Sequence, residues 1–205
     1  PDSVGRFVEQ DKASELAGIT VNNSGLFFPE AGWATPPLLC KWLTEHPNIT
    51  IKTSTHIAKL EHKENNWTAF TKENQTLSAS IVVVASAADS TLLEQLKQLP
   101  VQKIRGQVSL TQSNIQAPPL NTVLCSQGYI SPSKEGRFCF GATFDLKDEA
   151  TDIRESGHQH NLTKIAEMAP ELANTLQQYH TENSLTGRVG FRCASPDKLP
   201  MIGAV

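Results

Sequence analysis

One arginine near the C-terminus has neighbours that could present it to a small acid. Arg192 follows Gly190-Phe191 and precedes Cys193-Ala194-Ser195-Pro196-Asp197, and the chain then runs through Leu199-Pro200-Met201-Ile202 to Gly203. A guanidinium group can hold a carboxylate by two parallel hydrogen bonds. On spacing alone, a structural ion pair with a nearby acid such as Asp197 is favoured over this role. The sequence by itself therefore leaves two alternatives for Arg192, substrate binding or a structural ion pair.

Tyr129 is the second residue whose side chain could bind a substrate. It lies in Gly128-Tyr129-Ile130-Ser131-Pro132, ahead of a turn at Lys134-Glu135-Gly136 and the run Phe140-Gly141-Ala142-Thr143. A tyrosine hydroxyl can donate a hydrogen bond to a carboxylate. A tyrosine that only packs at a sheet edge explains the same pattern.

The remaining polar motifs predict no further chemistry. His158 and His160 form a His-x-His pair at a helix start, where solvated side chains are expected and a metal site is not. The cysteines, Cys40, Cys125, Cys139 and Cys193, form no Cys-x-x-Cys pair and have apolar neighbours, so we expect buried, unreactive thiols. No Ser-His-Asp set, phosphate-binding Walker loop or nucleophile elbow occurs, so no residue is assigned as a catalytic acid, base or nucleophile.

Composition and charge narrow the classes of function. The 205 residues carry a net charge of −3, which is not typical of a free-standing nucleic-acid binder, so nucleic-acid contact would need a local patch or a partner domain. The longest apolar stretch, Ile81 to Ala85, is far too short to cross a bilayer. With no apolar signal core at the N-terminus, we expect a cytoplasmic protein. Because the sequence does not begin with Met, we interpret it as a piece of a longer chain.

The first half of the chain predicts helices and strands in alternation. One helix is expected at residues 12–17, ending at Gly18, a second after Thr35 as its N-cap, and a third at 91–99. Strands are expected at 25–29, 49–52, 56–62 and 67–71. Ile81-Val82-Val83-Val84-Ala85 is β-branched and apolar, a pattern typical of a parallel strand that is buried on both faces.

The second half predicts an antiparallel sheet with helices. Strands are expected at 104–110, 121–125, 128–132 and 137–144, helices at 152–168 and 171–179, and a last strand at 184–191. One interleaved pair of domains, of mixed α+β and α/β class, explains this order better than two domains in series.

Four blocks of sequence resemble the D-amino-acid-oxidase family of FAD-dependent oxidoreductases. They are Gly32-Trp33 with Pro36-Pro37, then Arg105-Gly106-Gln107, then Gly128 to Pro132 with the following Gly-Ala-Thr, and finally Gly187 to Gly203. The phrases Leu-Phe-Phe-Pro-Glu-Ala-Gly-Trp and Gly-Arg-Val-Gly-Phe-Arg-Cys-Ala-Ser-Pro-Asp resemble one branch of the family, the flavin-dependent half of bifunctional tRNA-modifying enzymes.

This resemblance implies a D-amino-acid-oxidase-like fold, in which an antiparallel substrate-domain sheet with helices is interleaved with part of an FAD-binding domain. Residues 1–24 would end a substrate-domain segment, 25–103 would form the middle of the FAD-binding domain, 104–183 the substrate domain, and 184–205 a return segment of the FAD-binding domain. The family's opening Gly-x-Gly-x-x-Gly turn, which cradles the FAD pyrophosphate, does not occur here. We therefore expect an internal fragment that does not bind FAD tightly by itself.

The resemblance also implies roles for individual residues. Arg192 and Tyr129 would bind the carboxylate of the substrate. Gly32, Trp33, Ala85, Ser86 and Gly203 would contact FAD. The flavin takes a hydride from a neutral amine, so the protein supplies mainly orientation.

The implied reaction is the removal of a carboxymethyl group from 5-carboxymethylaminomethyl-uridine, with or without a 2-thio group, at the tRNA wobble position. The implied partners are tRNA and a methyltransferase domain that uses S-adenosylmethionine; no membrane partner is implied. Two alternatives stay open. One is a flavin oxidase of free glycine or sarcosine, and the other, for the isolated fragment, is a non-catalytic module that binds tRNA or a partner.

Overall fold

The structure, a computed structural model, describes residues 4–112, 115–183 and 185–204. Ser184, the first residue of the predicted last strand, lies outside these ranges. The chain divides into two compact units, each made of two segments: unit 1 is Pro1–Ala34 with Arg105–Gly190, and unit 2 is Thr35–Ile104 with Phe191–Val205. Among the described residues, none of the helices combines the length and apolar character that a membrane span requires.

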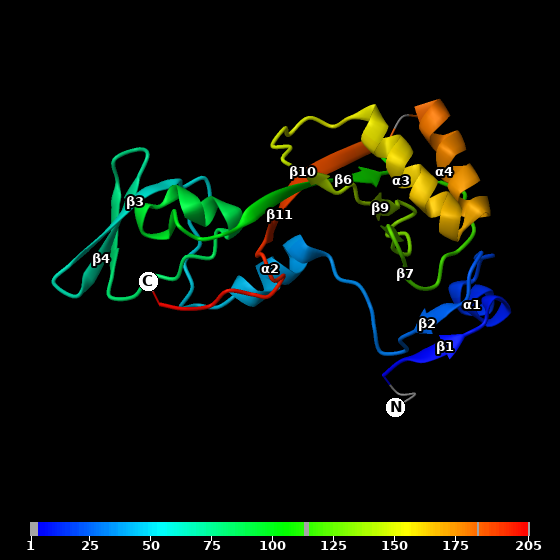
Figure 1. Ribbon diagram of the computed structural model, residues 1–205, viewed down its shortest axis with the longest axis horizontal. Helices are drawn as coiled ribbons and strands as arrows, with labels where there is room; N and C mark the ends of the chain where they lie inside the picture. Colours follow the sequence, from blue (N-terminus) through cyan, green and yellow to red (C-terminus); the bar gives the residue numbers. More distant parts are fainter. Residues whose placement is uncertain (1–3, 113–114, 184, 205) are drawn as a thin grey trace. The chain divides into compact units, whose positions relative to one another are not determined.

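The centre of unit 1 is an antiparallel sheet. Its strands follow the order β10 (Asp145–Leu146), β6 (Gln102–Leu110), β9 (Cys139–Gly141), β8 (Tyr129–Ile130) and β7 (Leu124–Cys125), and β11 (Thr186–Ala194) also pairs with β6. Figure 1 shows β11 beside β6. The turn predicted at Lys134-Glu135-Gly136 is confirmed, because Lys134 bridges to Arg137 and both Glu135 and Gly136 have positive φ.

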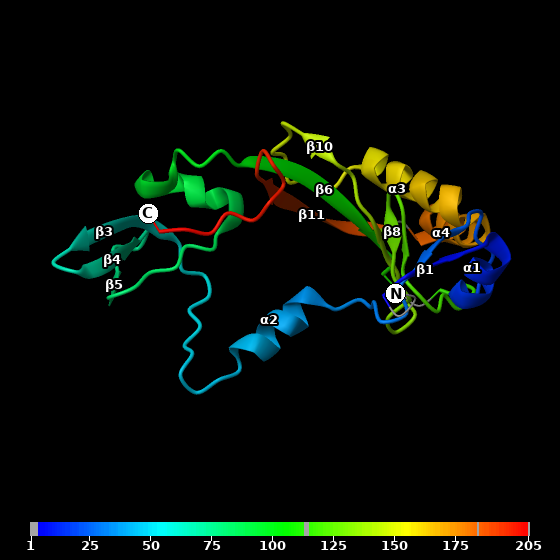
Figure 2. The same ribbon diagram turned by 60° about the horizontal axis from the view of Figure 1, so that its bottom comes forward.

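Two helices cover one face of this sheet. Helices α3 (Glu155–Met168) and α4 (Pro170–Asn183) lie side by side along it (Figures 1 and 2). Ile165, Leu172 and Leu176 on these helices are fully buried, as are Ile130 and Phe140 on the strands below them. Burial of each such side chain contributes about 1.5–3 kcal/mol, so the sheet and helices form one core.

The N-terminal part of unit 1 is a helix and a two-stranded ribbon. Helix α1 (Gln10–Ala17) lies between β1 (Arg6–Val8) and β2 (Gly25–Phe27), which pair antiparallel. The helix ends as predicted at Gly18, whose φ of 75° is the left-handed conformation that favours glycine.

Unit 2 has a smaller core. Helix α2 (Pro36–Thr44) begins after Thr35 as predicted, and β3 (Ile57–Lys63), β4 (Asn66–Thr71) and β5 (Thr76–Ala79) form a three-stranded antiparallel sheet. Two short 3₁₀ segments follow, at Ala87–Leu92 and Glu94–Leu96. Leu60, Leu93 and Leu96 are the buried residues of this unit's apolar cluster.

Three predictions in unit 2 are wrong, and one strand, β5, was not predicted. Residues 49–52 form no strand, and residues 91–99 form 3₁₀ turns in place of an α-helix. The largest error concerns Ile81 to Ala85, which is not a strand: Ile81 is 77% exposed and Val83 is 83% exposed. A central strand needs hydrogen-bonded neighbours at both edges, and no described strand pairs with these residues.

Candidate functional site

The sheet of unit 1 has a second face that α3 and α4 do not cover. Ile130 pairs with Phe140, and both side chains are fully buried under the helices. Successive side chains of a strand point to opposite faces. Their neighbours Tyr129 and Cys139 therefore lie on the other face, where each is half-buried. This surface, the open face, carries the predicted substrate residue Tyr129.

On the open face, the side chain of Tyr129 forms a hydrogen bond with that of Cys139. Burial raises the pKa of the Cys139 thiol, while the positive charge of Arg188 and the bond to Tyr129 act in the opposite direction. The two residues come from adjacent strands, since Tyr129 pairs with Gly141 of β9.

Arg188 also belongs to the open face. A Cβ placed on the preceding Gly187 would lie 3.2 Å from Cε1 of His158, which is a residue of the covering helix α3. Because strand side chains alternate, Arg188 points away from α3. Its side chain is exposed, and its charge acts on the Cys139 thiol.

Arg192, the other predicted substrate residue, belongs to unit 2 and is exposed. Asp197, its candidate ion-pair partner, is bound within its own turn: its carboxylate accepts hydrogen bonds from the Ser195 hydroxyl and the Leu199 amide, both at 3.0 Å. The Leu199 amide, followed by Ser195, lowers the pKa of Asp197. Because Arg192 and Tyr129 fall in different units, their role as a pair stays a prediction.

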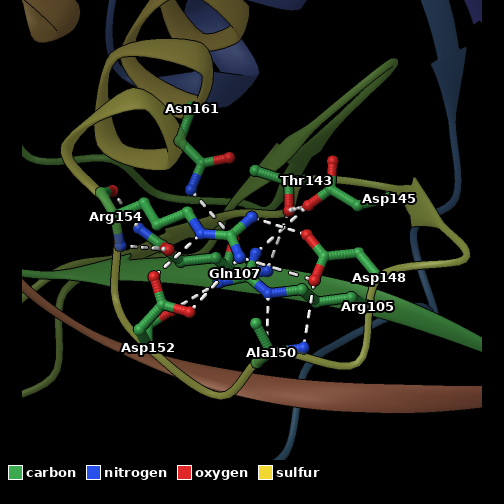
Figure 3. Close-up of polar contacts among 9 residues, drawn as sticks. All are labelled: Arg105, Gln107, Thr143, Asp145, Asp148, Ala150, Asp152, Arg154 and Asn161. Atoms are coloured by element: carbon green, nitrogen blue, oxygen red, sulfur yellow. Dashed lines mark hydrogen bonds and ion pairs between the residues drawn. The ribbon is translucent and has the colours of Figure 1, made fainter.

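The helix-covered face of the sheet contains a polar network instead of a purely apolar core (Figure 3). Arg105 is 1% exposed, and its guanidinium donates to the carbonyls of Ala150 and Asp152 and to the carboxylate of Asp145. A buried guanidinium needs most of its donors satisfied. Arg105 meets this need by binding the segment between β9 and α3.

Gln107 ties the same segment to the sheet. Its side-chain amide accepts from the Arg154 amide and donates to the Arg154 carbonyl, both at 2.8 Å. Asn161 of α3 donates to the Gln107 carbonyl and to the Ser109 hydroxyl, both at 3.0 Å. The Arg-Gly-Gln block thus holds the start of α3 against β6.

Charged groups reinforce this segment at the surface. The guanidinium of Arg154 donates to the carboxylates of Asp148 and Asp152. These bonds lower the pKa of both carboxyls and raise the pKa of Arg154. These side chains are partly exposed, so each ion pair contributes little to the stability of the fold.

One prediction about the histidines is wrong. His158, expected to be solvated, is buried at 3% exposure, and its Nδ1 lies 2.8 Å from the Ser109 hydroxyl. Burial lowers the pKa of His158. His160 is exposed. Among the described residues, no cluster of three or more His, Cys, Asp or Glu side chains could hold a metal ion.

The cysteine prediction is also wrong in part. Cys40 and Cys125 are exposed, and Cys139 and Cys193 are half-buried. All four are free thiols in the structure. Apolar neighbours in sequence did not predict burial, because Cys40 lies on α2, none of whose residues is buried.

The predicted cofactor residues are all exposed. Gly32 and Gly203 have no heavy atom within 4 Å of the position that a Cβ would occupy, Trp33 is 45% exposed, and Ala85 and Ser86 are exposed. Gly32 and Trp33 belong to unit 1, and the other three residues belong to unit 2. Their contact with FAD stays a prediction. The phosphate cradle itself is not in this sequence.

Sequence reasoning missed Arg188 and Cys139 as members of the open face. The signal for Arg188 was available, since Arg188, Gly190 and Arg192 alternate along one predicted strand. Cys139 could not have been found this way, because its contact with Tyr129 depends on the register between β8 and β9.

Comparison with known proteins identifies the family. The family described as FAD dependent oxidoreductase matches residues 2–205. The chain is 42% identical over 205 residues to the tRNA 5-methylaminomethyl-2-thiouridine biosynthesis bifunctional protein MnmC of Chromobacterium violaceum, covering 99% of the chain. It is 39% identical to the protein of the same name from Methylobacillus flagellatus, covering 100% of the chain. In both cases the chain spans 31% of the relative's length.

Solved flavoenzymes have the same fold. Glycine oxidase from Geobacillus kaustophilus superposes with a TM-score of 0.80 at 19% identity, over 97% of this chain and 54% of that one. L-proline dehydrogenase from P. horikoshii gives a TM-score of 0.80 at 16% identity, over 98% of this chain and 56% of that one. The predicted fold class and the predicted cofactor, FAD, are therefore confirmed. The chain belongs to the FAD-dependent oxidoreductase family.

Proposed function

We propose that this chain is part of a flavoenzyme that removes the carboxymethyl group from 5-carboxymethylaminomethyl-uridine, or its 2-thio form, at the wobble position of tRNA. The observation that carries the proposal is the 42% and 39% identity, across essentially the whole chain, to proteins named for tRNA 5-methylaminomethyl-2-thiouridine biosynthesis. Their name also says that they are bifunctional. A linked methyltransferase domain, acting on the aminomethyl product with S-adenosylmethionine, is part of the same proposal.

The reacting group of this substrate is a secondary amine with a carboxylate, in effect a glycine joined through its nitrogen. The carbon between nitrogen and carboxylate gives up a hydride, and the nitrogen–carbon bond becomes an imine. Water then adds to the imine, which breaks down to glyoxylate and an aminomethyl-uridine. FAD, when bound, supplies the acceptor for the hydride.

The chain's own residues would bind and orient this group. The family resemblance assigns the carboxylate to Arg192, through a charge-assisted pair, and a supporting hydrogen bond to Tyr129. Tyr129 is suited to that task, because its hydroxyl lies on the open face and its partner Cys139 is a weak hydrogen-bonding group that a carboxylate can replace. Residues 1–24 and 104–183 would belong to the substrate domain, and 25–103 and 184–205 to the FAD-binding domain.

A direct assay tests this function. The flavoprotein that contains this chain is incubated with tRNA carrying 5-carboxymethylaminomethyl-uridine, and glyoxylate and modified nucleosides are measured by mass spectrometry. We expect equal amounts of glyoxylate and aminomethyl-uridine. Oxidation of free glycine or sarcosine with no change in the tRNA would support the amine-oxidase alternative. Flavin loading without either reaction would contradict both.

A further inference from the structure

Arg188 differs from the other arginines whose contacts the structure describes. Arg105, Arg137 and Arg154 form ion pairs with carboxylates, and Arg6 lies over the ring of Phe27 at 5.4 Å. Among the described residues, no hydrogen bond or ion pair to the Arg188 guanidinium is present. A Cβ added to Gly190, two residues further along the strand, would lie 3.7 Å from the Nη1 atom of Arg188.

The position of Arg188 in the sheet indicates what its charge could bind. It lies on the open face of the sheet, with Tyr129 of β8 and Cys139 of β9. Gly190 lies on the same side of the strand and adds no side chain next to the guanidinium. An exposed arginine without a described ion pair therefore lies on the same sheet face as a predicted substrate residue.

The class of ligand that Arg188 could bind follows from the chemistry of its guanidinium group. A guanidinium binds a carboxylate or a phosphate oxygen pair in a two-point grip. A free glycine-type amine has one carboxylate, which the proposed function already assigns to Arg192. A carboxylate that one guanidinium holds by two hydrogen bonds has no oxygen left for a second two-point grip, so the carboxylate assigned to Arg192 does not account for Arg188. A nucleic-acid substrate supplies the second anion in its backbone.

We propose that Arg188 binds a backbone phosphate of the RNA substrate and so selects a nucleic acid over a free amino acid. This inference rests on the proposed function, because it takes RNA as the carrier of the reacting group. It also accounts for RNA binding by a chain with a net charge of −3: the contact is local, through a cation on the open face, and does not need a basic protein.

The test compares two substrates that share the reacting group. One is an anticodon stem-loop RNA that contains 5-carboxymethylaminomethyl-uridine, and the other is the free modified nucleoside, which has no phosphate. In the flavoprotein, Arg188→Gln should raise KM for the stem-loop about fivefold to tenfold with kcat within about twofold, since a charge-assisted contact to a phosphate is lost. The slope of log affinity against log salt should fall by about 0.7–0.9. Arg188→Lys should recover part of the affinity. Oxidation of the nucleoside and flavin content should not change.

The matched control is Arg137→Gln, which removes the same group where Glu135 already neutralises it. It should leave KM and the salt slope unchanged. If Arg188→Gln behaves like this control, the inference is overturned while the proposed function stands. A loss of nucleoside oxidation or of flavin equal to the loss on RNA would also overturn it. If the wild type oxidises neither substrate, the proposed function fails, and fluorescence anisotropy with the unmodified stem-loop still decides whether Arg188 binds RNA.

Discussion

At the scale of single residues, the substrate assignment rests on Arg192 and Tyr129. Arg192 should contribute more than Tyr129 to binding of the substrate carboxylate, because it offers a charge-assisted pair, whereas Tyr129 offers one neutral hydrogen bond. In the flavoprotein, Arg192→Met is expected to lower the rate of carboxymethyl removal about tenfold to a hundredfold, and Tyr129→Phe should cost less. Flavin content should be unchanged in both variants, as measured by visible absorbance after purification.

The contact between Tyr129 and Cys139 supplies the control for that experiment. Cys139→Ala removes the thiol partner and keeps the tyrosine hydroxyl, so oxidation should stay close to the wild-type rate. If Arg192→Met oxidises the carboxymethylated tRNA at a near-normal rate, the carboxylate assignment is wrong and Arg192 is a structural residue. If Cys139→Ala is as slow as Tyr129→Phe, the effect of Tyr129 comes from its bond to Cys139.

His158 gives the fold a pH dependence of known sign. Ser109 accepts a hydrogen bond from Asn161, which leaves its own hydrogen free to bind the unprotonated Nδ1 of His158. Burial lowers the pKa of His158 below its unfolded value, with Glu155 opposing this shift and His180 adding to it. The unfolded chain therefore binds the proton more readily, and stability that is present above about pH 6.5 should be lost as the pH falls.

The measurement is urea unfolding of the wild type and of His158→Asn between neutral and mildly acidic pH. Below about pH 6.5 the wild type should lose stability more steeply, because the variant has no proton to bind at this position. The lowered pKa of Glu155, caused by Gln159 and then His180, affects stability only at lower pH, below the ordinary glutamate value of 4.5. Parallel curves for the two proteins would show that His158 does not carry this dependence.

At the scale of elements, the sequence predicted local structure well where the signal was local. Thr35 and Pro36 began α2, Gly18 ended α1, and Glu135-Gly136 formed the hairpin turn. Ile81 to Ala85 failed because apolar, β-branched residues form a buried strand only when other strands pair with them, and that information is not in the segment itself. The contact between Tyr129 and Cys139 on the open face could not be predicted either, since it depends on the register between β8 and β9.

Arg105 is the residue on which the segment between β9 and α3 depends most. Replacing it with Met would leave the Ala150 and Asp152 carbonyls and the Asp145 carboxylate without their donor. Removing one partner of a buried ion pair lowers the free energy of unfolding by about 3–5 kcal/mol. Because Asp145 is partly exposed, we expect Arg105→Met to lower it by about 3 kcal/mol, as measured by urea unfolding. Arg105→Lys should cost less. Arg137 forms an ion pair at the surface and supplies the comparison. If Arg105→Met lowers the free energy of unfolding no more than Arg137→Met does, this role for Arg105 is wrong.

At the scale of the whole molecule, family membership and cofactor retention are separate questions. The chain matches the FAD-dependent oxidoreductase family across residues 2–205, yet it has no Gly-x-Gly-x-x-Gly turn. That turn, at a helix N-terminus, supplies the backbone N–H groups that bind the FAD pyrophosphate. The residues predicted to touch FAD are exposed, two in unit 1 and three in unit 2, and none of them belongs to such a turn.

The 205-residue chain by itself should therefore not retain FAD. Purified protein would be saturated with FAD, dialysed, and assayed for flavin absorbance per mole of chain; we expect a ratio far below one, because contacts without the pyrophosphate cradle lose the strongest charge-assisted bonds to the cofactor. A protein joining the chain to a nucleotide-binding unit from one of the curated relatives is the matched control and should retain flavin. A stoichiometric yellow complex of the chain alone would mean that exposed residues such as Trp33 and Gly203 hold the flavin without a phosphate site.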